Sequence, residues 1–159
     1  MKLIAQRWTR LAAATLAGAT MIMLVSAARA QGPQIAQVKT ATGDAAVIRS
    51  GARLAAKAGD PIYEKDTIET GESGAIGLTF IDNTVMSAGP NSEIDLAEYR
   101  FDSGNFRGAM LTDMRKGTLT VVSGDIARSS PGAMRVKTPA AMLGVRGTRF
   151  AVQVEGSRW

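Results

Sequence analysis

The chain of 159 residues contains no cysteine and no histidine, and aromatic residues make up only 5% of it. These absences exclude thiolate nucleophiles, Ser-His-Asp relays, Cys/His zinc sites and disulfide bonds. Catalysis would have to depend on carboxylates, Lys, Tyr or a borrowed metal ion. The few aromatic residues are not interleaved with basic ones, which disfavours nucleic-acid binding. Their scarcity also disfavours a lectin.

The first thirty residues have the features of a secretory signal peptide. Basic residues without any acid occupy positions 1–10, a run of mostly apolar and small residues follows at 11–28, and Ala28-Arg29-Ala30 fits a cleavage site. We expect cleavage after Ala30 and a periplasmic or secreted mature protein with no stable membrane span. A single transmembrane anchor is the alternative, because the apolar run is at the lower length limit for a span.

The mature part of the chain, residues 31–159, is nearly neutral, with 15 basic and 14 acidic residues. Most of the formal charge of +5 therefore lies in the predicted signal peptide and forms no basic surface for nucleic acid. A chain of this length buries enough apolar surface to fold without disulfide bonds. We expect a lead-in at 31–43, a main domain at 44–154 and a tail at 155–159.

Turn-forming residues recur every eight to twelve positions in the mature chain and predict a single all-β domain of short strands. Between the turns, apolar and other residues alternate, as at Ile76, Leu78 and Phe80, and a period of two is typical of strands. The sequence Ile81-Asp82-Asn83-Thr84 predicts a tight hairpin, since Asp and Asn tolerate a left-handed backbone. The even spacing suits a β-solenoid-like domain and a rolled β-sandwich equally.

The turn residues and the alternation together define most of the expected strands. These are residues 35–41, 45–50, 66–70, 76–80, 85–88, 94–96, 109–115, 118–123, 133–138 and 149–155. Residues 52–58 would also suit one helical turn, and residues 140–145 are too few to distinguish a strand from a turn by period. Tyr99, Phe101 and Phe106 are expected on a loop, either as a recognition surface or packed onto the core.

Two segments, 59–92 and 136–152, carry distinctive motifs. The motif residues of the first are Gly59, Asp60, Asp66, Thr70, Gly71, Gly89 and Pro90, and those of the second are Thr138, Pro139, Arg146, Gly147 and Thr148. Together the segments resemble the FecR domain family. The resemblance implies an extracytoplasmic all-β module, found in regulators of iron-siderophore uptake and in other envelope proteins, and it does not imply catalysis.

The chain departs from the signalling members of that family at its N-terminus. Those members carry a cytoplasmic region that acts on a sigma factor, whereas only about ten residues precede the apolar segment here. We therefore expect a stand-alone module without an anti-sigma role.

Two groups of charged residues are candidate sites. Asp60, Glu64, Asp66 and Glu69 could bind Ca²⁺ or supply the paired carboxylates of a glycosidase, but their spacing is not that of an EF-hand, which favours turn and strand roles. Arg146 could bind an anion or an acidic partner. We favour an internal ion pair in which Arg146 holds the C-terminal strand to the sheet.

The sequence thus predicts a non-catalytic periplasmic or envelope module that binds another protein or relays a signal through protein contacts. No residue is assigned to catalysis, to a cofactor or to a metal ion, and the partner is expected to be an envelope protein rather than nucleic acid. A module that binds a small anion, a metal or a glycan is the first alternative. A carboxylate-only enzyme is the second.

Overall fold

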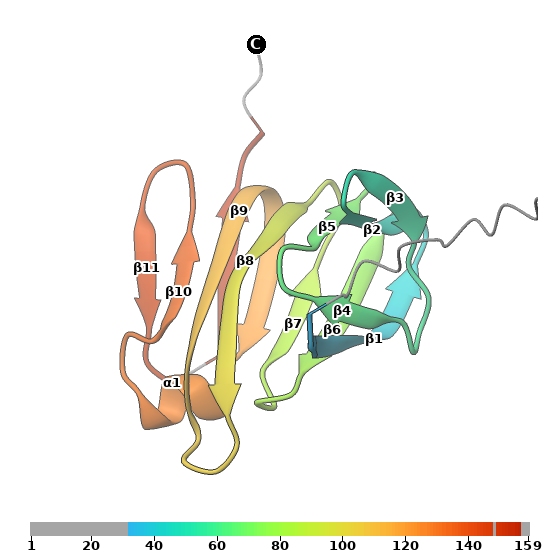
Figure 1. Cartoon of the computed structure of the whole chain (residues 1–159). Helices are drawn as coiled ribbons and strands as arrows, with labels where there is room; N and C mark the ends of the chain where they lie inside the picture. The colour runs from blue at the N-terminus through green and yellow to red at the C-terminus, as the bar shows by residue number, and fades with distance from the viewer. Residues whose placement is uncertain (1–31, 148, 157–159) are drawn as a thin grey trace, which may run out of the picture. The chain divides into compact units, whose positions relative to one another are not determined.

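The computed structural model describes residues 32–147 and 149–156, so the predicted signal peptide lies outside the described residues. The described part is all-β, as predicted (Figure 1). Its elements are β1 (Gln34–Thr42), β2 (Ala45–Arg49), β3 (Ala52–Ala55), β4 (Pro61–Tyr63), β5 (Thr67–Thr70), β6 (Ala75–Phe80), β7 (Val85–Ala88), β8 (Glu93–Asp102), β9 (Arg107–Val122), α1 (Asp125–Ser129), β10 (Met134–Lys137), β11 (Met142–Val145) and β12 (Arg149–Val154). Within residues 32–147 and 149–156, no helix is both long and apolar enough to span a membrane.

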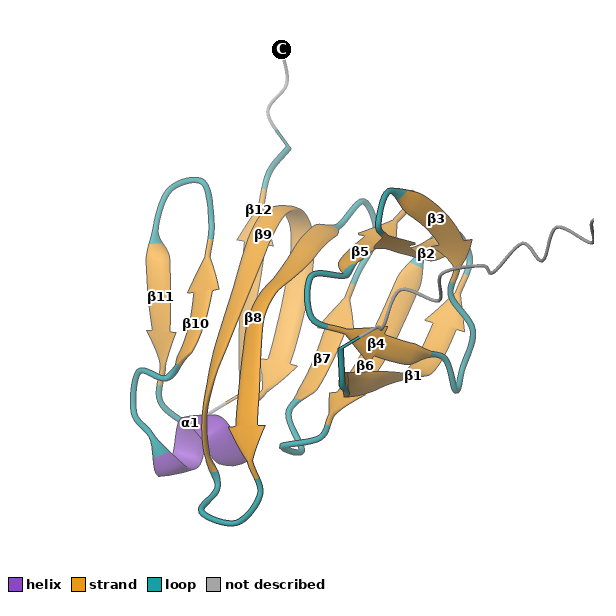
Figure 2. Cartoon of the chain, viewed as in Figure 1, coloured by secondary structure: helices purple, strands orange, loops and turns teal. Residues whose placement is uncertain are grey.

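Strand β9 joins the two halves of one curled, mostly antiparallel sheet (Figure 2). Its first part pairs with β8 on one side and with the parallel strand β10 on the other, and β11 pairs with β10. Its last part pairs with β7 and β12. One half of the sheet continues through β8, β5 and β2 to β3, and the other through β7, β6 and β1 to β4. Of the two expected architectures this is the rolled one, since a solenoid stacks parallel strands.

Both halves contribute side chains to one apolar core. In β6, Ile76, Leu78 and Phe80 are buried, as their alternation predicted. They pack in the same cluster as Ile94 and Met114 from the other half of the sheet. Burial of this shared apolar surface stabilises the packing of the two halves, which β9 also connects.

The sheet changes direction at a corner where β7 runs into β8 opposite a bend in β9. The Ser92 hydroxyl donates to the Gly89 carbonyl at 2.8 Å and accepts the Thr118 backbone N–H at 3.0 Å. The Thr70 hydroxyl accepts the Ser92 N–H at 2.9 Å and donates to the same Gly89 carbonyl at 2.6 Å. These bonds satisfy backbone groups that the bend removes from the regular ladder.

Gly117 makes this corner possible. Its φ is +95°, and a Cβ atom at this position would lie well within 3.0 Å of the Ser92 side chain and backbone. Gly117 was expected to end one strand and begin another, but it lies inside β9, which is continuous from Arg107 to Val122. The prediction of two separate strands was wrong because a glycine can also bend a single strand.

Residues 52–55 and the segment around Tyr99 also differ from the sequence-based expectation. Residues 52–55 form strand β3 rather than a helical turn, because Ser50 and Gly51 both have positive φ and make the tight turn that pairs β3 with β2. Tyr99 and Phe101 belong to β8 rather than to a loop, and Tyr99 is buried. Of the three aromatic residues, Phe106 alone lies in the β8–β9 loop, and it is exposed.

The predicted hairpin at 81–84 is confirmed between β6 and β7, with Asn83 at a φ of +64°. Its Asp82 is fully buried, and the carboxylate accepts bonds from the Tyr99 and Thr84 hydroxyls at 3.1 and 2.7 Å. The same carboxylate accepts the Ile126 N–H at 3.4 Å at the start of α1. Burial raises the pKa of Tyr99 above its ordinary value, so the phenol remains a hydrogen-bond donor.

We predict that Gly117→Ala destabilises the domain by at least about 2 kcal/mol, because it adds a steric clash with Ser92 to the cost of a left-handed backbone. Gly51→Ala is the matched control, since Gly51 also has a positive φ but a Cβ there would meet nothing within 4 Å. Thermal unfolding of both variants checks the prediction. Equal melting temperatures would show that contacts at the corner do not limit stability.

Candidate functional site

The motif residues fall into three separate places in the fold. Gly59, Asp60 and Asp66 lie in the turns on either side of β4, and Thr70, Gly71, Gly89 and Pro90 lie at or beside the corner. Thr138, Pro139, Arg146 and Gly147 lie around β11. Thr148 is outside the described residues. The structure therefore does not bring the two motif segments together into one pocket.

Asp66 is the buried acid of an ion pair that joins β2 to the turn before β5. Its carboxylate accepts two parallel bonds from the Arg49 guanidinium, at 2.9 and 2.7 Å, and a third from the Tyr63 N–H at 2.9 Å. Arg49 also donates to the Pro61 carbonyl and lies over the Tyr63 ring at 4.5 Å from its centroid. The hydrogen bond with Asp66 raises the pKa of Arg49 above its ordinary value.

The other three carboxylates of the acidic group have different partners. Asp60 accepts the Lys57 N–H, Glu64 accepts the Tyr99 N–H, and Glu69 pairs with Arg53. Each carboxylate therefore has a local structural role. The arrangement gives no support to a calcium or glycosidase site, because the four groups do not point to a common centre.

Gly59 has a φ of +97° in the turn before β4, and its N–H donates to Val38 in β1. Gly71 lies against the Asp44 side chain, so a Cβ at this position would be 2.6 Å from a carboxylate oxygen. These two motif glycines therefore serve backbone geometry, as expected for turns.

The internal ion pair expected for Arg146 is not found. Arg146 is exposed, and its side chain has no hydrogen bond or ion pair with any residue in 32–147 or 149–156. The buried Arg–carboxylate pair of this fold is formed by Arg49 and Asp66 instead. That pair holds β2 to the turn before β5 and was not predicted from the sequence.

The second motif builds a hairpin that projects beyond the curled sheet. The Thr138 N–H donates to the Ala141 carbonyl at 2.8 Å, and the Thr138 hydroxyl accepts the Ala141 N–H at 3.1 Å, which closes the turn around Pro139. Residues 140–145 were ambiguous in the sequence, and residues 142–145 form β11. Strand β11 exposes 54% of Met142 and 39% of Leu143.

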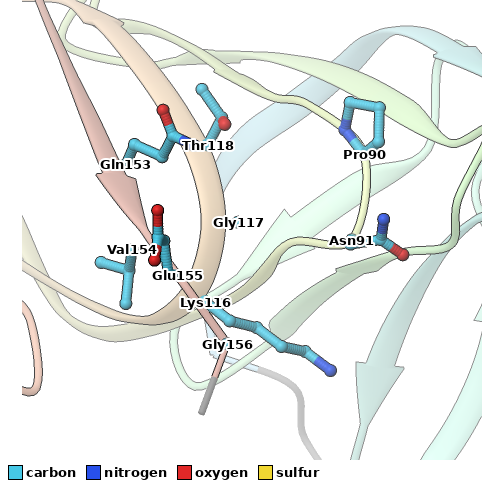
Figure 3. Close-up of a pocket in the computed structure, with 9 residues that line it drawn as sticks. All are labelled: Pro90, Asn91, Lys116, Gly117, Thr118, Gln153, Val154, Glu155 and Gly156. Atoms are coloured by element: carbon cyan, nitrogen blue, oxygen red, sulfur yellow. The ribbon is translucent and has the colours of Figure 1, made fainter. Parts of the chain in front are cut away.

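The larger of two depressions in the surface, about 740 Å³, lies at the corner (Figure 3). The end of β12 forms one wall, the Pro90–Asn91 turn forms the other, and residues 116–118 of β9 lie between them. Its polar side chains include those of Lys116, Asn91 and Glu155, but none of the nine lining residues is buried. A small ligand would therefore compete with water for every polar group there.

A second depression, about 380 Å³, separates the β10–β11 hairpin from β12. We call it the C-terminal groove. Its lining residues are Arg115, Thr138, Pro139, Ala140, Leu143, Val152, Gln153, Val154 and Glu155. Within the part of the chain that the structure describes, β11 pairs only with β10 and β12 only with β9, so an unpaired strand edge flanks each side of the groove.

Charge is distributed unevenly along residues 31–159, although the acidic Glu155 also lines the C-terminal groove. Residues 31–125 contain nine basic and thirteen acidic residues, whereas residues 126–154 contain five basic residues and no acidic one. The five are Arg128, Arg135, Lys137, Arg146 and Arg149. The net charge of residues 31–159 is close to zero and hides this separation, although the sequence shows no acidic residue between Asp125 and Glu155.

A family model described as FecR protein matches residues 66–158, which is more than half of the chain. The match covers the corner, the hairpin and the C-terminal groove. The chain belongs to the FecR family. No curated protein and no solved structure matches it. Membership places the chain in a family of regulatory and signalling proteins, and the resemblance predicted from the two motif segments is confirmed.

We predict that Arg49→Met lowers the free energy of unfolding by about 3 kcal/mol, because it leaves the buried Asp66 carboxylate without its counter-charge. Arg146→Met should change it by less than about 0.5 kcal/mol, as is usual for an exposed side chain without partners. Denaturant unfolding of the two variants makes the comparison. A larger loss for Arg146→Met would restore the structural role first expected for that residue.

Proposed function

We propose that this FecR-family chain is a non-catalytic module of the cell envelope that relays a signal by binding another envelope protein. Export to the periplasm or the cell exterior is part of the proposal. It is supported by the N-terminal charge and hydropathy pattern and by the family to which the chain belongs. The partner is a protein, and the contact is made by the hairpin and the C-terminal groove.

The observation that carries this proposal is the exposure of Met142 and Leu143 on β11. Apolar side chains on an unpaired strand edge attract other chains, and natural proteins usually protect such edges with charges, proline or a covering segment. In the described part of the chain, β11 has no strand partner other than β10. A protein partner would bury the two side chains and satisfy the strand edge at once.

The chemistry of the described residues supports binding rather than catalysis. The carboxylates of the first motif are held by separate partners, and the buried Asp82 is bonded to Tyr99, Thr84 and the start of α1. The hydrogen bonds and ion pairs of these acids stabilise the fold. None of the polar residues around the larger depression is buried, so the small-ligand alternative gains no enclosed set of donors there.

We predict that a photo-crosslinking amino acid at Leu143 forms discrete adducts in cells, whereas the same amino acid at Leu54 does not. Leu54 is the matched control, because it is also on an edge strand, β3, and is 45% exposed. Adducts are detected by their mass shift on a denaturing gel of the envelope fraction. An absence of adducts at Leu143, or the same adducts at both positions, would refute a specific protein contact at the hairpin.

A further inference from the structure

We propose that β11 binds an extended, acidic segment of the partner protein as an added β-strand. This inference deepens the proposed function and rests on it, since it names how the partner binds and what chemistry it has. The added strand would lie beyond β11, at the margin of the sheet in Figure 1.

The backbone of β11 is prepared for such an addition. The hydrogen bond between Thr138 and Ala141 closes the hairpin, and Lys137 pairs with Met142 and Val136 with Leu143. Bonded and non-bonded pairs alternate in an antiparallel ladder, so the N–H and C=O groups of Leu143 face β10. Those of Met142 and Gly144 face away from it. These outward groups would bond to a new strand.

The side chains of β11 leave a row of core residues incomplete. Leu96, Thr112, Val136 and Leu143 are registered across β8, β9, β10 and β11 on the inner face of the sheet. The first three are buried, whereas Leu143 is 39% exposed. An added strand with an apolar residue at the next position of this row would cover Leu143. Apolar residues at every second position are therefore expected in the partner segment.

Charge specifies the remaining positions of that segment. Arg146 follows β11 directly and Arg149 begins β12, and neither side chain has an acidic partner among the described residues. Arg128 of α1 is close by, since a Cβ at Gly147 would lie 3.9 Å from its Cγ, and its pairing with Asp125 is long at 3.6 Å. Three cations at this end of the hairpin favour carboxylates on the partner.

The same charges disfavour a second copy of this chain as the occupant. A pair of β11 strands from two copies would bring the basic regions at 126–154 of both copies to one interface. Regions of like charge brought together at one interface repel each other. An acidic strand from a different protein has no such repulsion.

The full chain is expressed, and the protein is purified from the envelope. Its binding to three labelled synthetic decapeptides is then compared. In these peptides valine alternates with glutamate, lysine or serine. We expect the Val/Glu peptide to bind at least tenfold more tightly than the Val/Lys peptide, as measured by fluorescence anisotropy at low salt. Equal affinity for the two charged peptides would refute the acidic character of the partner.

Two variants of Gly144 test strand addition itself. Gly144→Pro removes the outward N–H, and Gly144→Ala keeps it, with nothing within 4 Å of the added Cβ. We expect the Pro variant to lose at least tenfold in affinity for the Val/Glu peptide and the Ala variant to bind like the native protein. Circular dichroism verifies that both are folded. Native affinity in a folded Pro variant would refute strand addition.

Charge reversal at Arg146 is an independent test, because it changes the affinity for the peptide without altering the backbone of β11. Arg146→Glu should weaken binding of the Val/Glu peptide at least fivefold. Lys57→Glu is the control and should leave binding unchanged. Lys57 is also exposed, but it follows β3 at the opposite end of the sheet. Equal effects of the two reversals would show only a response to net charge and would contradict a site at β11.

The outcomes separate this inference from the proposed function. Crosslinks at Leu143 that persist in Gly144→Pro would refute strand addition while leaving a protein-binding hairpin. An absence of crosslinks in the native chain would refute both. Concentration-dependent dimers in sedimentation that disappear in Gly144→Pro would identify a second copy as the occupant and overturn the proposal of an acidic partner.

Discussion

The bend of β9 at Gly117 is the constraint on which the rest of the structure depends. Because the backbone turns there against Ser92, a single strand serves both halves of the sheet. The halves can then curl toward each other and share one core. The Thr70 and Ser92 hydroxyls replace the ladder bonds lost at the bend. Backbone N–H and C=O groups at the corner therefore keep hydrogen-bond partners.

The same bend creates the open side of the domain. Beyond β9, the first half of the sheet ends in the β10–β11 hairpin and the second half ends in β12. The C-terminal groove lies between them. Family-motif residues at the corner thus shape the fold, while Thr138 and Pro139 shape the exposed hairpin. This division of roles explains why motifs far apart in the sequence need not form one pocket.

Local sequence patterns predicted those elements whose conformation depends on neighbouring residues. The alternation in β6 and the turn at 81–84 depend on neighbouring residues, and both were predicted correctly. Helix α1 was missed because its N-cap, Gly124, gives no side-chain capping signal, and the Asp82 carboxylate that accepts the Ile126 N–H lies 44 positions earlier in the chain. Arg146 was misassigned for a similar reason. Arg49 reaches Asp66 because β2 pairs with β5, and this pairing cannot be predicted from a local sequence pattern.

We propose that β11 is an open strand edge that an acidic strand completes. Amide hydrogen exchange measured by NMR, with and without the Val/Glu peptide, tests this strand addition. We expect the Met142 and Gly144 amides to exchange rapidly in the free protein and to become protected on binding, while Leu143 and Val145 are protected throughout by β10. Protection of Met142 and Gly144 already in the free protein, or no change in either amide when the peptide binds, would contradict it.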